Sequence, residues 1–203
     1  MKTFKLINAV LLSSFLIFSV GCSKEEPVSG DLQTADAHIA PDEMANNGAK
    51  AKMYTVEFGA LNNSGVSGTA ELSLEGSTLT VTISASGLDA GLHPQHIHGF
   101  AENKGNSTCP PASADTDGNG IISIPEGAPF YGGVLLPLSP FPEAGEDGTI
   151  EFTMTYEYED GVDANLTPLQ NRTIVLHGMD TAEGYSATTP VACGQIQGSQ
   201  GSN

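Results

Sequence analysis

The chain has 203 residues, enough for one domain with a substantial core, and its 24 acidic residues against 7 basic ones give a net charge of −17. Such a surface repels nucleic acid and anionic lipid, so neither is expected to bind it directly. Hydrophobic residues make up 39% of the chain and alternate as in strands, so the acidity does not indicate disorder.

The first 21 residues have the pattern of a secretory signal. A basic start precedes an apolar run over residues 6–20, which is too short to span a membrane. The run ends at Gly21-Cys22, which resembles a bacterial lipobox. We therefore expect Cys22 to be lipidated and to anchor the mature chain, outside the cytoplasm, to the cell envelope. An ordinary signal peptide that contains a cysteine is the alternative.

The segment after Cys22 predicts a tether. Its Ser-Lys-Glu-Glu start resembles an export tag of surface lipoproteins in Bacteroidetes-type bacteria, which implies the outer membrane, facing outward. Residues 22–51, which include His38, are polar and have no steady period, so a flexible tether is expected there. Residues 199–203 are a polar tail, which leaves residues 52–198 as one domain.

The domain has the pattern of an all-β fold. Alternating hydrophobic residues predict seven strands, at 53–58, 68–74, 78–85, 95–100, 149–158, 173–176 and 191–196. The turn Glu75-Gly76-Ser77 predicts a hairpin between the second and third strands. No segment has a convincing helical period, so the sequence predicts a β-sandwich or barrel with a long loop over residues 101–148.

Two cysteines remain in this domain, Cys109 and Cys193. In an exported protein an even pair predicts a disulfide, here closing a loop of 84 residues. The chain-entropy estimate for such a loop is roughly 4–5 kcal/mol of stability. The alternative is a copper or zinc thiolate site, but an oxidising compartment and the lack of Cys-x-x-Cys spacing disfavour it.

Histidines gather at one predicted strand. His96 and His98 are two residues apart, so their side chains share a face and can hold one metal ion, whereas His93 points to the other face. His177 follows the β-branched run 173–176 and could complete the site. Ligation by imidazoles alone suits copper or zinc. Scaffold roles for these histidines are the alternative.

Residues 115–126 fit the twelve-residue calcium loop of EF-hands, with Gly120 at the turn. The predicted oxygen donors, in order, are Asp115, Asp117, Asn119, the Ile121 carbonyl, Ser123 and Glu126. Prolines on both flanks predict a lone loop without EF-hand helices. A surface turn rich in Asp, Gly and Asn is the alternative reading.

From about Tyr54 to Gly198 the chain resembles the Cu/Zn superoxide dismutase family. Four motifs appear in order: Gly91-Leu92-His93 with His96-Ile97-His98, then Cys109, then Arg172-Thr-Ile-Val-Leu-His177, then Val191-Ala-Cys193-Gly-Gln-Ile196. The resemblance implies a Greek-key β-barrel of eight strands and a Cys109–Cys193 disulfide. It also implies catalytic copper on His96, His98 and His177, and a structural His93 that hydrogen-bonds backbone near the site.

The chain lacks two features of the family, the zinc ligands and the arginine that guides superoxide to the copper. Asp115 stands where the bridging histidine is expected, and no histidine lies between His98 and His177, so no zinc is expected. Pro190 replaces the family's guiding arginine. Without residues 1–21 the chain keeps 5 basic residues (7 − 2) against 24 acidic ones, and a net charge of −19 is unsuited to attracting an anion. Asp115 cannot serve both calcium and copper.

Three functions are therefore candidates. The first is an anchored, copper-dependent dismutase acting on superoxide, and the second is a protein that binds or buffers copper ions without turnover. The third is a structural domain stabilised by calcium, because Gly133 to Leu138 and the strands before His96 also resemble a bacterial chordin-type domain. A dimer is compatible with each of the three.

Overall fold

The computed structural model describes residues 50–198. The expected signal sequence, the expected lipidation site Cys22, His38 and the polar tail lie outside these residues, as does nearly all of the expected tether. Between residues 50 and 198 no helix is both long and apolar enough to cross a membrane.

The described chain is all-β, as predicted, and it carries one short α-helix. The strands are β1 (Lys52–Ala60), β2 (Ser67–Glu75), β3 (Thr78–Ser86), β4 (Gly91–Leu92), β5 (Gln95–Gly99), β6 (Gly133–Pro137), β7 (Glu143–Ala144), β8 (Thr149–Glu157), β9 (Thr173–Thr181), β10 (Gly184–Gln195) and β11 (Gln197–Gly198). The helix is α1 (Ile124–Tyr131), and the 3₁₀ turns are η1 (Ala101–Asn103), η2 (Ala112–Ala114) and η3 (Leu169–Asn171).

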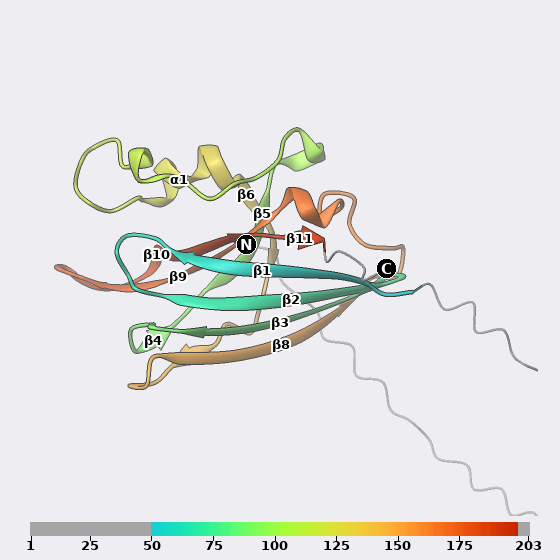
Figure 1. Ribbon diagram of the computed structural model, residues 1–203, viewed down its shortest axis with the longest axis horizontal. Coiled ribbons are helices and arrows are strands. Elements are labelled where there is room, and N and C mark those ends of the chain that lie inside the picture. Colours follow the sequence, from blue (N-terminus) through green and yellow to red (C-terminus); the bar gives the residue numbers. More distant parts are fainter. Residues whose placement is uncertain (1–49, 199–203) are drawn as a thin grey trace, which may run out of the picture. The chain divides into compact units, whose positions relative to one another are not determined.

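One antiparallel sheet of nine strands curls into a half-barrel (Figure 1). Its order is β6-β5-β9-β10-β1-β2-β3-β8, with β11 paired to β1, while β4 and β7 form a separate small ladder. The chain crosses between the two ends of this sheet on the way from β3 to β5, from β6 to β8 and from β8 to β9. These crossings place β5 beside β9, although the two strands are far apart in sequence.

Strand alternation builds the inner core. In β3, Leu79, Val81, Ile83 and Ala85 are all buried, and the polar residues between them face outward. The predicted β2–β3 hairpin is confirmed, with Glu75 paired to Thr78 across a two-residue turn. Gly76 begins this turn at φ +57°, a conformation that costs glycine little.

The prediction of a chain without a helix was wrong at residues 124–131. Glu126 reaches back to the residue before the helix, where its Oε2 accepts a bond from the Ser123 N–H at 2.9 Å. Pro125 lies in the first turn, where its missing N–H would have had no partner in the helix. The Ser-x-x-Glu capping pattern therefore starts a helix that the prolines alone argued against.

Two strand predictions also needed correction. Strand β9 continues to Thr181 and β10 begins at Gly184, so both are longer than the predicted hydrophobic segments. The hydrophobic pattern did not predict these extensions because the residues there are mostly polar and partly exposed. The edge strand β6 lies in the stretch predicted as loop. Its apolar residues are consecutive and do not alternate, so no strand period marked it.

Candidate metal centre

Three of the predicted ligands meet on the outer face of β5 and β9. The antiparallel register sets His96 opposite Val175 and His98 opposite Thr173. The pairs between them, such as Ile97 with Ile174, face the inner core. His177 lies two residues beyond Val175 and therefore joins the outer face. The pairing of β5 with β9 thus gathers the three histidines.

The imidazoles converge closely enough to share an ion. One ring nitrogen from each of His96, His98 and His177 lies within 4.8 Å of those of the other two. His98 and His177 are 4% and 3% exposed, and His96 is half-buried. Nδ1 of His96 and Nε2 of His98 and His177 are buried without a hydrogen-bond partner among the described residues. Each such nitrogen costs roughly 1–3 kcal/mol, and a shared metal ion would satisfy all three.

The other nitrogens of two rings are held by backbone carbonyls. His98 Nδ1 donates to the Gly132 carbonyl at 3.1 Å, and His177 Nδ1 donates to the Thr188 carbonyl at 2.9 Å. A carbonyl only accepts, so both protons are assigned to Nδ1 and both Nε2 lone pairs are left free. In metal sites, a hydrogen bond of this kind fixes the tautomer and the orientation of a histidine ligand.

Burial keeps these rings neutral. Desolvation lowers the pKa of His98 and of His177 from 6.5 to about 4, although the bonds to Gly132 and Thr188 raise it, and a positive charge on His96 lowers it further. Desolvation also lowers the pKa of His96. Neutral imidazole is the form that binds metal, so the three ligands are ready at neutral pH.

We therefore expect the copper affinity to persist in mildly acidic solution. Protons compete for His98 and His177 only as the pH approaches about 4, whereas ordinary histidines are protonated below 6.5. We expect copper affinity to be nearly constant from about pH 8 through pH 6.5 and to fall only in more acidic solution, because the pKa of each of the three rings is lowered. Competition titrations over this range, with circular dichroism at each pH to confirm folding, measure it. An affinity that already falls through pH 6.5 would contradict the burial argument.

The same depressed pKa values give the apo protein a pH-dependent stability. The pKa of each buried ring is lower in the folded state than in the unfolded state. Its contribution to the free energy of unfolding is therefore complete above about pH 6.5. That contribution is lost as the pH falls from there to about 4.

Aromatic side chains flank the centre. Phe141 packs edge-on against His96, with ring centroids 5.4 Å apart. Tyr131, which is fully buried at the end of α1, packs against His98 at 4.8 Å. The two rings remove water from the histidine that each of them contacts.

His93 stays apart from the donor set. It is fully buried, and its ring nitrogens lie 2.9 Å from the His177 carbonyl and 2.7 Å from the Asp89 carbonyl. Gly178, at φ +113°, leaves room for this ring, because a Cβ there would collide with His93 and Tyr185. His93 therefore ties the backbone of a predicted ligand to the segment before β4.

The predicted disulfide Cys109–Cys193 is confirmed, and it fastens the long loop to β10. A second, outer cluster of buried residues surrounds it, made of Leu61, Tyr131, Val175 and Cys193, with Cys109 and Ala128 packed against it. This cluster lies on the same sheet face as the histidines. The loop that supplies Gly132 and Tyr131 is thus attached beside the centre.

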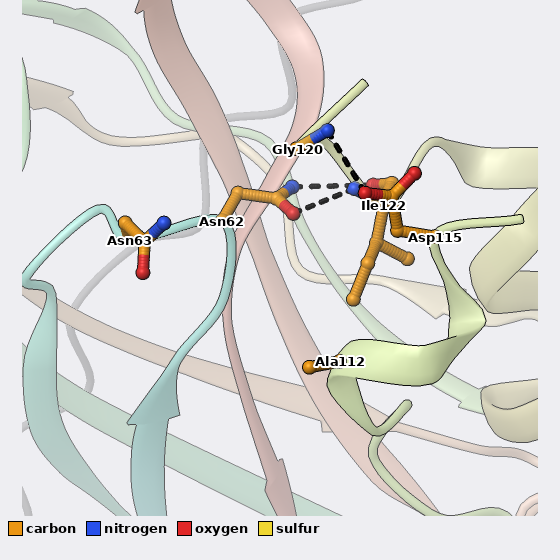
Figure 2. Close-up of a pocket in the computed structure, with 6 residues that line it drawn as sticks. All are labelled: Asn62, Asn63, Ala112, Asp115, Gly120 and Ile122. Atoms are coloured by element: carbon orange, nitrogen blue, oxygen red, sulfur yellow. Dashed lines mark hydrogen bonds between the residues drawn. The ribbon is translucent and has the colours of Figure 1, made fainter. Parts of the chain in front are cut away.

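Asn62 joins two segments beside the candidate sites, and its role was not predicted from the sequence. Its side-chain oxygen accepts a bond from the Ile122 N–H at 2.7 Å, and its amide donates to the Ile122 carbonyl at 3.1 Å (Figure 2). The same amide donates to the Pro190 carbonyl at 2.9 Å. Pro190 pairs with His177 across β10 and β9. Asn62 therefore connects the predicted calcium loop to the strand beside a predicted copper ligand. Its one sequence signal was the turn-forming pair Asn62-Asn63.

Replacing Asn62 with alanine should cost roughly 2 kcal/mol of stability, because three partly buried bonds lose their partner. Asn63→Ala is the matched control: Asn63 has the same left-handed backbone, at φ +55° against +56°, and its side chain makes no bond to another described residue. Urea denaturation of both variants measures the difference. Equal losses would mean that the backbone, and not the Asn62 side chain, matters.

The acidic donors of the predicted calcium loop also converge. Carboxylate oxygens of Asp115, Asp117 and Glu126 lie within 4.8 Å of one another. The Asp115 carboxylate accepts bonds from the N–H groups of Gly118 and Asn119, and from that of Gly120 (Figure 2). Asp115 groups with these carboxylates and not with the three histidines.

Glu126 closes this loop from its other end. Its carboxylate accepts bonds from the backbone and hydroxyl of Ser123 and from the backbone and hydroxyl of Thr116. These bonds, with those from Ser123 the largest, lower the pKa of Glu126 to about 2. The carboxylate is therefore charged throughout the physiological range and oriented toward the loop. A cation in the loop would meet an acceptor that is already deprotonated.

Comparison of the chain with protein-family models gave no match, and comparison with curated proteins gave none either.

Proposed function

We propose that this chain binds a copper ion through His96, His98 and His177, as a lipid-anchored protein of the cell envelope. One observation carries the proposal: the three histidines bring ring nitrogens within 4.8 Å of one another, and each has a buried ring nitrogen without a hydrogen-bond partner among the described residues. The imidazole set suits copper or zinc, and the resemblance to Cu/Zn superoxide dismutase favours copper. A copper ion held there supplies a one-electron redox centre. The anchor rests on the lipobox-like sequence at Cys22.

Copper binding without fast turnover is the better supported form of this function. Arg172 is the only arginine of the chain, and it is fully buried. Its guanidinium donates to the carbonyls of Asn165 and Asn171 and to the side-chain oxygen of Asn103. It is therefore not exposed to draw superoxide toward the histidines, and the net charge of −17 opposes the approach of an anion. The same charge attracts cations, including copper ions.

Superoxide dismutation is the second candidate. The agreement of His96, His98 and His177 with the family's copper ligands favours it, as does the Cys109–Cys193 disulfide. A fast reaction would need another source of attraction for superoxide. An assay on copper-loaded protein separates the two candidates, because buffering or delivery needs no turnover.

We propose in addition that the loop over residues 115–126 binds calcium. Six oxygen donors stand at the positions of the EF-hand pattern, and three of the carboxylates lie within 4.8 Å of one another. Calcium would stabilise the loop that leads into α1. It would take no part in the redox chemistry of the histidines.

Metal content tests both proposals together. The purified chain is offered copper, zinc and calcium at equal concentrations, dialysed, and analysed by mass spectrometry, followed by a superoxide assay. We expect about one copper and about one calcium per chain, no zinc, and slow turnover or none. Fast turnover would make the protein a dismutase. Absence of copper would leave the structural domain as the surviving alternative.

A further inference from the structure

We infer that the three-histidine centre selects Cu(I) over Cu(II), so that the protein takes cuprous ion as its cargo. This inference rests on the proposed copper binding and names the oxidation state that the centre prefers.

The donor set carries no negative charge. Its members are three imidazoles, and within residues 50–198 no Asp, Glu or Cys joins them at a mutual distance of 4.8 Å. Cys109 and Cys193 are already joined to each other. A bound Cu(II) would keep its full double charge in this set, whereas Cu(I) would keep a single charge.

The groups behind the ligands are neutral too. His98 and His177 donate to backbone carbonyls, those of Gly132 and Thr188. Many metal-binding histidines donate to a carboxylate, which makes the imidazole a stronger donor and offsets the charge of a dication. The carbonyls orient these rings without adding a negative charge. These two hydrogen-bond partners therefore do not offset the charge of a bound Cu(II).

The centre is also poorly hydrated. His98 and His177 are almost fully buried, and aromatic rings flank the set, Tyr131 against His98 and Phe141 against the half-buried His96. The free-energy cost of placing an ion in such a medium rises with the square of its charge, so a dication costs about four times as much as a monocation. Cu(I) is satisfied by three ligands, whereas Cu(II) and Zn(II) take four or more, so in this site each would need an added ligand such as water.

Separate affinities for the two oxidation states test the inference. Cu(I) is titrated anaerobically with ascorbate against a chromophoric Cu(I) chelator, and Cu(II) is titrated in air against an amino-acid competitor. We expect Cu(I) to bind at least 100-fold more tightly. By linkage this preference raises the reduction potential by about 120 mV over that of the free ions, since each tenfold corresponds to about 59 mV. A mediated redox titration measures that potential independently.

A variant of Phe141 tests the physical cause. Phe141→Asp places a carboxylate beside His96 and admits water, so the preference for Cu(I) should fall at least tenfold. Phe141→Leu keeps this flank apolar and should leave the preference within about threefold of the unmodified chain. Both substitutions are at a half-buried position, so both variants should fold, and circular dichroism checks this.

The outcomes distinguish this inference from the function beneath it. Cu(II) bound as tightly as Cu(I), or an unchanged preference in Phe141→Asp, would overturn the inference and leave copper binding intact. If copper in neither state depends on His98 and His177, the proposed function fails and the inference fails with it.

Discussion

Replacing His98 and His177 together with alanine should lower copper affinity at least a thousandfold. Both rings are almost fully buried, and each has a buried Nε2 without a hydrogen-bond partner among the described residues. Loss of a single group behind a metal ligand already costs about 10- to 100-fold in affinity, so loss of two of three ligands should cost more. Equilibrium dialysis followed by competition titration measures this loss.

Two controls make the result specific. His38→Ala removes a histidine outside the described domain and should leave copper affinity unchanged. Far-UV circular dichroism of the double variant should match that of the unmodified chain, because β5 and β9 keep their backbone ladder. Normal copper content in a folded double variant would show that the histidines are scaffold.

Removing the disulfide should produce the largest loss of stability. With Cys109 and Cys193 both changed to serine, the free energy of unfolding should fall by roughly 4–5 kcal/mol, because the crosslink closes a loop of 84 residues. Urea denaturation of the apo protein measures the change. A loss under about 1 kcal/mol would mean that the outer cluster holds the loop without the crosslink.

The centre should also weaken when this disulfide is absent. The crosslink attaches the loop that carries Tyr131 and Gly132, and both residues contact His98. We therefore expect the double serine variant to bind copper less tightly, even where it is folded. A reductant should reproduce both effects in the unmodified chain and should change nothing further in the variant.

Much of the fold follows from local sequence. The strands that alternate clearly, such as β2, β3 and β8, were predictable because one face of each is buried and the other meets water. The disulfide was predictable from the cysteine count and the expected compartment. The edge strand β6 was not, because its Val-Leu-Leu run has no period that separates strand from loop.

Helix α1 shows how competing local signals can mislead. Proline and glycine residues after Ser123 argued against a helix, whereas the Ser123/Glu126 capping pair argued for one. The capping pair decides because it satisfies N–H groups at the start of the helix, and Pro125 lies where no N–H is needed. Weighing the position of each proline, and not the number of prolines, would have predicted this helix.

Only part of the candidate metal centre could be predicted from the spacing of histidines in the sequence. Two-residue spacing places His96 and His98 on one face of any strand. Their meeting with His177 depends on which strands pair, and this information is non-local. The motif order shared with Cu/Zn superoxide dismutase supplied that expectation. Nothing local pointed to Gly132 and Thr188, because backbone carbonyls leave no signature in sequence.

A crystal structure of the copper-loaded chain, with anomalous diffraction collected at the copper edge, addresses the proposed centre itself. We predict one strong copper peak, bonded at about 2 Å to Nδ1 of His96 and to Nε2 of His98 and of His177. Gly132 and Thr188 should still accept from the other nitrogens of His98 and His177. A copper peak among Asp115, Asp117 and Glu126, or no peak near the histidines, would contradict the proposed site.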